Sequence, residues 1–490
     1  MFIQFQKRDP NIFESFAPVV LLIGLLFLSV QIFGEESSNG PNQIALILAG
    51  VLAWTISIFH GKSWRMLEEK ILENINLAMQ AILILLLMGA MIGIWILAGI
   101  VPSLIIYGLK LISYKYFLFT TCFFCALVSL TTGSSWTTAG TIGLAMIGIG
   151  NTLGIHPALT SGAVVSGAYF GDKMSPLSET TNMASSVAGT NLYTHIRYMT
   201  ITAIPSIVLT LIIFLFIGLF NDTAYSPQKI ATVTEILSRK FVVSPFVFIS
   251  PLLVIGLVIK RTDTIPALLA GCLGGIVTAI IFQREVIIEF TSEPNYSMAV
   301  FKAGIIASSS GFKTISGSSE VDALLSRGGM VGILPTVWLI LSAMFFGGIM
   351  DGSGMLYRIT HSVLYFAKNV FSLIAATIGT CFFVNLTASD QYLSILITGR
   401  MYKESYRMKN LAPENLSRAL EDSGTLSSPL IPWNSCGVFM ASSLGVSTIA
   451  YFPFCFFNLI NPVISLIYAF IGFSITKISS EDIAETSKIE

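Results

Sequence analysis

Two polar stretches interrupt apolar runs in this 490-residue chain and carry side chains suited to chemistry. Residues 171–182, G-D-K-M-S-P-L-S-E-T-T-N, include Asp172 and Glu179, and residues 421–434 include Asp422. Inside a membrane such a break leaves backbone groups unpaired, which is tolerated only where they line a cavity or bind something polar. The acidic side chains indicate that the polar species bound at these breaks is a cation. The alternative is that the first stretch is an ordinary aqueous loop between two helices.

Two further apolar segments, residues 116–150 and 370–398, are polar only at their centres. The first is interrupted by T-T-G-S-S-W-T-T at residues 131–138, and the second by N-L-T-A-S-D-Q at residues 385–391, which includes Asp390. A polar centre with apolar arms on both sides is typical of a re-entrant hairpin whose tip ends at mid-membrane.

We expect the two hairpin tips and the two breaks to converge on one site for sodium and protons. Sodium prefers oxygen ligands, and a carboxyl group in a dry cavity can hold either a proton or a sodium ion. The candidate ion- and proton-binding residues are Asp172, Glu179, Asn182, Asp390, Asp422 and Asn434. The supporting polar ligands are Thr132, Ser134, Ser135, Ser175, Thr181, Asn385, Thr387 and Ser428.

The acids also have structural alternatives. Asp172 could pair with the adjacent Lys173, and Glu179 could cap a helix. Glu421 and Asp422 follow a basic stretch, which also fits a position at the membrane surface. Asp390, at a hairpin tip, has few structural explanations.

The histidines offer little for catalysis. His60, His156 and His361 are expected to be solvated, and His195 is expected on the membrane surface, where it could also sense pH. An intramembrane hydrolase with Ser134 or Ser175 as nucleophile would need a base at similar depth, which these positions do not provide. We therefore predict no enzyme activity.

Composition identifies an integral membrane protein. The chain is 54% hydrophobic and 11% charged, against roughly 25% charged in soluble domains, and its mean hydropathy is +0.78. The 27 basic and 27 acidic residues give no net charge, so we expect no nucleic-acid partner. The six cysteines lie in or beside apolar runs and resemble buried hydrophobes. We expect no cofactor, and the oligomeric state stays open, a homodimer included.

Ten runs are long enough to span a membrane, or nearly so. They lie at about residues 17–33, 44–59, 77–100, 158–180, 199–220, 244–259, 265–282, 332–352, 420–442 and 447–473. Two shorter segments, 102–115 and 354–369, are predicted as helices at the interface. Residues 223–240 and 284–329 are predicted as outside loops.

The two halves align with a constant shift of 253 positions. Ser175-Pro176-Leu177 then falls on Ser428-Pro429-Leu430, and Ser134 falls on Thr387. Five spans and one hairpin per copy would make the copies inverted. The first repeat is predicted at residues 17–220, with a broken helix at about 158–185, and the second at residues 244–475, with a broken helix at about 420–442. A connecting loop, residues 221–243, joins the repeats. An N-terminal segment, residues 1–16, and a polar tail, residues 476–490, flank them.

Basic residues predict the orientation. If the hairpins do not cross, Lys62, His195 with Arg197, Lys260 and Arg358 all fall on the same side as the N-terminus, which is cytoplasmic by the positive-inside rule. The C-terminus falls on that side too. The predicted location is the inner membrane of a bacterial-type cell.

The sequence closely resembles the NhaC-type sodium/proton antiporters of the ion-transporter superfamily. The similarity lies in G-A-Y-F-G-D-K-M-S-P-L-S-E-T-T-N (167–182), A-G-T-N-L-Y-T-H-I-R (188–197), D-Q-Y-L-S-I (390–395), L-A-P-E-N-L-S-R (411–418) and the 421–434 motif. The family's conserved acids map onto Asp172, Glu179, Asp390, Glu421 and Asp422, whereas Asn191 stands where an aspartate is usual.

This resemblance implies an all-α polytopic transporter with inverted repeats, re-entrant hairpins and discontinuous helices at mid-membrane. It implies exchange of cytoplasmic sodium for external protons by alternating access. Relatives that exchange malate against lactate, or carry amino acids such as tyrosine, make coupled transport of a small organic acid or amino acid the alternative. An anionic substrate usually requires an arginine or a half-helix N-terminus, and no predicted span contains an arginine.

Overall fold

The computed structural model describes residues 8–220, 227–260, 262–314, 316, 318, 321–322, 325–326, 328–364 and 367–478, and all structural statements concern these residues. The predicted termini and connecting loop lie partly outside them. The helices of the first half are α1 (Ile12–Phe33), α2 (Pro41–Phe59), α3 (Trp64–Leu97), α4 (Ile100–Leu111), α5 (Phe117–Thr132), α6 (Ser135–Thr138), α7 (Leu144–Thr152), α8 (Pro157–Met174), α9 (Glu179–Ala188) and α10 (Leu192–Phe220).

The second half is also helical. Its helices are α11 (Pro227–Lys240), α12 (Ile249–Ile259), α13 (Thr264–Phe282), α14 (Arg284–Thr291), α15 (Tyr296–Ser309), α17 (Met330–Gly352), α18 (Met355–Leu364), α19 (Val370–Thr387), α20 (Gln391–Met408), α21 (Pro413–Leu420), α22 (Ser435–Leu444), α23 (Thr448–Tyr451) and α24 (Phe456–Ile471). A helix pairs its own backbone groups, which hydrocarbon requires.

The helices are long and apolar enough to make this a multi-pass membrane protein. Eight described helices could cross a membrane by length and composition, and up to ten if each of two bent helix pairs is one span. Large apolar side chains on α1 and α10, such as Phe27 and Phe216, are exposed, as lipid-facing side chains would be. The prediction of an all-α polytopic membrane protein is therefore confirmed.

Both predicted hairpins contain two helical arms with a turn at the polar centre. Gly133, with a φ of 68°, ends α5, and Ser389, with a φ of 59°, lies between α19 and α20. However, Tyr114–Thr132 and Val370–Thr387 are themselves long and apolar enough to cross a membrane. The re-entrant character of the hairpins thus stays a prediction.

The prediction of two outside loops was wrong about their local structure. Residues 227–240 form α11, and residues 284–309 contain α14 and α15. The helix α11 begins at a proline, which is well placed at a helix start, and its apolar residues Val233 and Leu237 are buried on one face. The short helices predicted within 102–115 and 354–369 correspond to α4 and α18.

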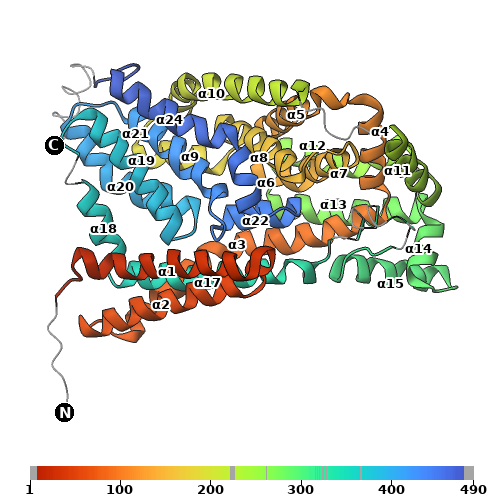
Figure 1. Cartoon of the computed structure of the whole chain (residues 1–490), viewed down its shortest axis with the longest axis horizontal. Helices are drawn as coiled ribbons and strands as arrows, with labels where there is room; N and C mark the ends of the chain where they lie inside the picture. Colours follow the sequence, from red (N-terminus) through yellow and green to blue (C-terminus); the bar gives the residue numbers. More distant parts are fainter. Residues whose placement is uncertain are drawn as a thin grey trace, which may run out of the picture.

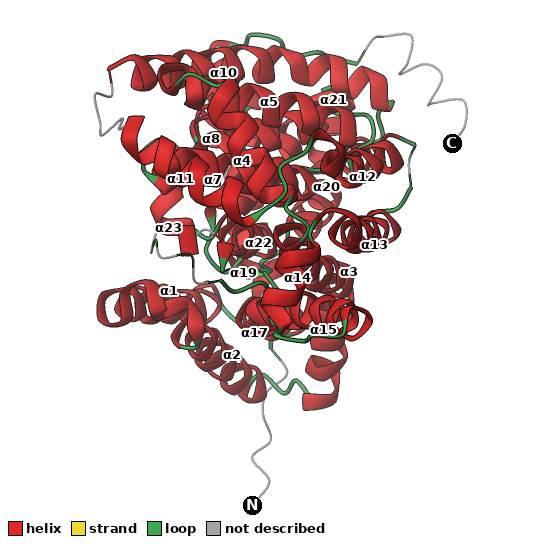
Figure 2. Cartoon of the chain, turned by 90° about the vertical axis from the view of Figure 1, so that its right-hand side faces the viewer, coloured by secondary structure: helices red, strands yellow, loops and turns green. Residues whose placement is uncertain are grey.

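The helices form two layers (Figures 1 and 2). The first layer contains α1, α2, α3 and α17, and the second contains α5, α8, α9, α10, α21 and α24. Within the second layer α5 packs closely along α8. The helix α20 packs against α9 and α21, and α19 packs against α20 and α21. The helix α22 contacts α3 and α17 of the first layer. The second broken segment, which α22 follows, therefore lies beside the boundary between the layers.

The helices recur in the same order in both halves. With the 253-residue shift, α1, α3, α5 and α8 fall on α13, α17, α19 and the segment containing α21. The shared order is what an internal repeat would produce. The inverted relation of the two copies, and the boundaries given above, stay predictions.

Candidate ion-binding site

The first break separates α8 from α9 at Ser175–Ser178, where Pro176 cannot donate a backbone hydrogen bond. Several predicted ligands satisfy the interrupted backbone here. The amide of Asn182 donates to the carbonyls of Pro176 (3.0 Å) and Ser178 (2.7 Å), and the Thr181 hydroxyl donates to the carbonyl of Lys173 (3.0 Å). The Ser175 hydroxyl accepts from the amide of Leu177 at 3.2 Å. Asn182 is exposed, so its position fits a capping role.

The second break begins with a π turn, Glu421–Thr425, that directly continues α21. Single π turns inside helices are rare and are often found at functional sites. A short 3₁₀ turn, Ser428–Leu430, follows, and the Ser428 hydroxyl donates to the Thr425 carbonyl at 2.7 Å. The π turn places two adjacent acids, Glu421 and Asp422, in the protein interior. The alternative that they lie at the membrane surface is thus wrong.

The first hairpin tip is tied to the first break through Asp172. One carboxylate oxygen of Asp172 accepts from the backbone amide of Ser135 (3.1 Å) and from its hydroxyl (2.7 Å). Ser135 begins α6, where unpaired amides attract an anion. Asp172 is only 6% exposed. The structure therefore joins the predicted residues Asp172 and Ser135.

The second hairpin tip is tied to the second break in a similar way. Asp390 accepts from the amides of Tyr392 (2.9 Å) and Leu393 (3.1 Å), and its other oxygen accepts from the hydroxyl of Ser435 (3.2 Å). Ser435 begins α22, so Asp390 joins the tip of one hairpin to the half-helix after the break. Asp390 is buried, as predicted for an acid at a hairpin tip.

Asn385 and Asn434 strengthen this connection. The amide of Asn434 donates to the backbone carbonyl and the side-chain oxygen of Asn385, at 3.1 and 3.2 Å. Asn385 in turn donates to the carbonyl of Gly424 in the π turn at 2.6 Å and to the Ser427 hydroxyl at 2.8 Å. Both asparagines are fully buried, so their amides are held by this network.

The centre of the site is a buried ion pair. The Lys173 ammonium lies 2.5 Å from Asp422 Oδ1, and both side chains have no exposed surface. Thr202 of α10 (3.1 Å) and Asn461 of α24 (2.7 Å) donate to the same carboxylate oxygen. Asp422 Oδ2 has no hydrogen-bond partner among the described residues. Lys173 thus pairs with Asp422 from the other half of the chain, and the predicted alternative of an Asp172–Lys173 pair is wrong.

Glu421, next to this pair in the sequence, has no exposed surface. Neither of its carboxylate oxygens has a hydrogen-bond partner among the described residues. Lys173 and Asp172 are the charged groups that act on it, and the hydroxyls of Thr425 and Thr180 face it. An unpartnered buried carboxylate is costly, which points to a group that binds something.

The remaining predicted residues are placed less centrally. Glu179 is exposed and accepts from the Tyr392 hydroxyl at 2.7 Å, so it lies at the edge of the site. The Thr387 hydroxyl donates to the carbonyl of Phe383 in its own helix, at 2.8 Å. Thr132 likewise donates within α5, and Ser134 caps α6 by accepting from the Thr137 amide. The structure does not bring these three hydroxyls to the acids.

Two histidines that were predicted to be solvated are buried. His195 has no exposed surface, and neither ring nitrogen has a hydrogen-bond partner among the described residues. Lys173 and Asp422 are the charged groups that act on it. His60 is 5% exposed, and its Nε2 lies 3.2 Å from Glu14. The error for His195 arose because α10 was expected to start at the surface, whereas α10 packs against α9 and α21.

Sequence reasoning missed the roles of Lys173, Thr202, Asn461 and His195. Asn461 lies inside the predicted span 447–473, and an amide within an apolar span is a signal that could have been used. Lys173 was recognised, but only as a neighbour of Asp172. Thr202 has no such signal, because threonine is common in membrane helices.

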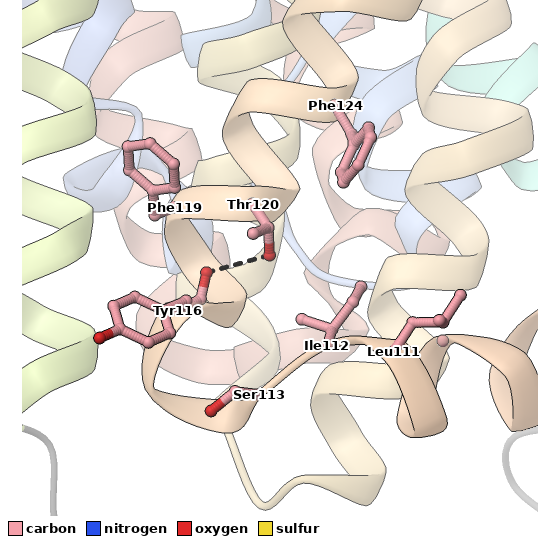
Figure 3. Close-up of a pocket in the computed structure, with 8 residues that line it drawn as sticks. Leu111, Ile112, Ser113, Tyr116, Phe119, Thr120 and Phe124 are labelled. Carbon is pink, nitrogen blue, oxygen red and sulfur yellow. Dashed lines mark hydrogen bonds between the residues drawn. The ribbon is translucent and has the colours of Figure 1, made fainter.

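A cavity of about 500 Å³ lies away from these acids, at the turn between α4 and α5 (Figure 3). It is lined by residues such as Leu111, Phe119 and Phe124, and the Thr120 hydroxyl donates to the carbonyl of Tyr116 at 3.0 Å. None of the described residues that line it is charged. Its lining suits an apolar group rather than an ion.

Removing the Ser135 hydroxyl should loosen the first hairpin tip. Ser135→Ala is expected to lower the free energy of unfolding by about 1.5–3 kcal/mol, because hydrogen bonds to charged groups contribute about that much. Thermal unfolding of the purified protein in detergent measures the change. Ser134→Ala is the matched control, since it removes only a neutral cap worth about 1 kcal/mol. Equal losses in the two variants would contradict the tie to Asp172.

Known proteins of one family resemble this chain over most of its length. The Na+/H+ antiporter family model matches residues 13–169 and 167–473. The Na+/H+ antiporter NhaC of Alkalihalophilus pseudofirmus is 39% identical over 439 residues, which cover 89% of this chain and 91% of that protein. The malate-2H+/Na+-lactate antiporter of Bacillus subtilis is 33% identical over 466 residues, 95% of this chain and 96% of that protein.

Among solved structures, MtrF of Neisseria gonorrhoeae matches with a TM-score of 0.36 and 14% identity, covering 95% of this chain and 96% of that one. A similarity that low adds nothing to the assignment. The family model and the sequence relatives both cover most of the chain. The protein belongs to the Na+/H+ antiporter family.

Proposed function

We propose that this protein is a secondary transporter that exchanges cytoplasmic sodium for external protons. The observation that carries the proposal is the fully buried Lys173–Asp422 pair, with the unpartnered oxygens of Asp422 and Glu421 beside it. Charged groups within membrane segments are costly, and they usually mark ion pathways and proton relays. Transport, not an enzymatic reaction, is the function that such groups serve here.

The proposed sodium ligands are oxygens around Asp422, from the π turn, α10 and α24. Asp422 Oδ2 and the amide oxygen of Asn461 have no hydrogen-bond partner among the described residues, and the Thr202 hydroxyl already contacts Asp422. Carboxylate, amide and hydroxyl oxygens are ligands that hard cations prefer. Sodium bound at Asp422 would compete with the Lys173 ammonium for the same carboxylate. When sodium takes the place of the ammonium at Asp422, Lys173 would release its proton, so the site holds either sodium or a proton and the two flows are coupled.

Asp172 and Asp390 would link ion binding to movement. Each joins a hairpin tip to a broken helix, so a change in charge at either would alter how tip and break are held together. In the proposed cycle, the second layer moves against the first and opens the site to one side at a time. Asn385 and Asn434 would hold the second break in a fixed position, and Glu179 would lie at the entrance to the ion site.

The orientation and repeat organisation form part of the proposal. Two inverted copies, residues 17–220 and 244–475, would place both breaks at the same depth from opposite directions. Both termini would face the cytoplasm, as the basic residues predict. The protein would lie in the inner membrane of a bacterial cell, where sodium/proton exchange serves pH homeostasis.

Proton flux in proteoliposomes tests the function. Adding sodium should move protons across the vesicle membrane when no organic solute is present. Asp172→Asn and Asp390→Asn are each expected to slow this exchange by about tenfold or more, which corresponds to roughly 1.4 kcal/mol of lost ion or transition-state binding. The matched control is Asp263→Asn, since Asp263 is exposed and caps no helix through its side chain. Unchanged exchange in both site variants would exclude this role for the two acids.

The same vesicles address the organic-solute alternative. The Bacillus subtilis relative is named for malate and lactate, which makes these two acids the relevant probes. We expect sodium-driven proton flux to proceed without them and to be unchanged by their addition. Flux that requires malate or lactate would favour the alternative over simple cation exchange.

A further inference from the structure

We propose that Glu421 forms a second sodium site, separate from Asp422, so that each chain binds two sodium ions. The inference rests on the proposed sodium/proton exchange and extends it to the number of ions. It assigns a role to the buried acid that the exchange at Asp422 leaves unused.

Glu421 and Asp422 are neighbours in sequence but have different surroundings. Asp422 is directed towards Lys173 of α8, Thr202 of α10 and Asn461 of α24. Glu421 faces the hydroxyls of Thr180 in α9 and Thr425 in the π turn, and it shares only the charge of Lys173 with Asp422. Adjacent residues of a helix point in different directions, so the two carboxylates are presented to different neighbours.

The Glu421 environment offers oxygen atoms without partners. Both carboxylate oxygens of Glu421 and the hydroxyl oxygen of Thr425 have no hydrogen-bond partner among the described residues, and both residues are completely buried. The Thr180 and Thr425 hydroxyls lie beside the Glu421 carboxylate, but neutral hydroxyls do not compensate a buried charge, so the carboxylate calls for a bound species. Carboxylate and hydroxyl oxygens together suit sodium.

The charge of the cluster also calls for two cations. Among the described residues, the interior holds the four carboxylates of Asp172, Asp390, Glu421 and Asp422, against two cations, the Lys173 ammonium and the Arg418 guanidinium. His195, the remaining titratable neighbour of the pair, has both ring nitrogens unpartnered and adds no charge when neutral. Burying an uncompensated charge is expensive. Two monovalent cations would balance the two excess carboxylates.

Equilibrium binding of radioactive sodium to the purified full-length protein in detergent tests the proposal. The wild type is expected to bind two sodium ions per chain, and Glu421→Gln one. If the two sites cooperate, the Hill coefficient for sodium is expected to approach about 2 in the wild type and to be about 1 in Glu421→Gln, because it cannot exceed the number of sites. Thr425→Val keeps the acid and should weaken one of the two binding events without abolishing it.

Glu235→Gln is the matched control, because Glu235 is an exposed glutamate of α11 paired with Arg239, and it should leave both ions bound. Thermal unfolding verifies that each variant is folded. A wild type that binds one sodium ion, or a folded Glu421→Gln that still binds two, overturns the second site. A wild type that neither binds sodium nor shows sodium-driven proton flux would instead contradict the proposed function itself.

Discussion

Asp422→Asn is expected to abolish sodium-driven proton flux and to lower the free energy of unfolding by about 3–5 kcal/mol. Removing one partner of a buried ion pair leaves the other charge uncompensated, and losses of that size are typical. Here the stranded group is the Lys173 ammonium, which has no exposed surface and lies 2.5 Å from Asp422. Thermal or denaturant unfolding in detergent gives the stability change, and proteoliposomes give the flux.

A double variant separates the two effects. Lys173→Met combined with Asp422→Leu removes both charges, and replacing a whole buried pair by apolar groups is often neutral for stability. We therefore expect the double variant to recover most of the lost stability but none of the transport. Recovery of transport would show that the pair is structural only.

An exposed ion pair provides the control for this cycle. Arg239 and Glu235 of α11 are 2.5 Å apart, and their side chains are 79% and 60% exposed. Arg239→Met is expected to cost about 0–1 kcal/mol, as for other surface pairs, and to leave exchange intact. A loss comparable to that of Asp422→Asn would mean that burial is not the cause of the effect.

The first helix break and the second hairpin tip could be predicted from sequence because each is marked by residues within a single segment. Charges and a proline within an apolar run mark the break after α8, and the buried tip at Asp390 follows from an acid at the centre of an apolar segment. The lengths of the apolar runs gave most of the helices. Each of these features depends on residues within one segment.

The pairing across the site had no such signal. Lys173 and Asp422 are 249 positions apart, and each has an acidic sequence neighbour, so local reasoning paired Lys173 with Asp172 instead. His195 was placed at the surface because its nearest basic neighbour, Arg197, suggested a membrane face. Its burial depends on how α10 packs against α9 and α21, which a single segment does not reveal.

The errors outside the site have a related cause. The polar composition of residues 227–240 suggested a loop, but buried Val233 and Leu237 show that an amphipathic helix packs there. Polar composition alone distinguishes poorly between a loop and such a helix. The spacing of the apolar residues, three or four apart, was the better signal.

Close packing of α8 on α5 positions Asp172, and it depends on two glycines. A Cβ atom at Gly167 would lie 2.1 Å from the carbonyl oxygen of Cys122, and one at Gly171 would lie 2.3 Å from that of Ala126. Small residues four apart allow helix backbones in membranes to approach closely. Both contacts are with backbone atoms, so a methyl group can be accommodated only if the helices separate.

Gly171→Ala is therefore expected to lower the free energy of unfolding by about 1–3 kcal/mol or more, as overpacking of a tight contact does. It should also reduce sodium-driven proton flux, because Asp172 follows directly and its 2.7 Å bond to Ser135 depends on the position of α8. Thermal unfolding and proteoliposome flux measure the two effects. Gly167→Ala should behave similarly in stability.

The chain offers matched controls for this substitution. A Cβ atom at Gly24 in α1 or at Gly332 in α17 would meet nothing within 4 Å. Alanine is the better helix former by about 0.5–1 kcal/mol, so Gly24→Ala and Gly332→Ala should be neutral or slightly stabilising. If Gly171→Ala also proved neutral and left exchange unchanged, the spacing between α5 and α8 would not control the geometry of Asp172, and its hydrogen bonds to Ser135 would have to hold it unaided.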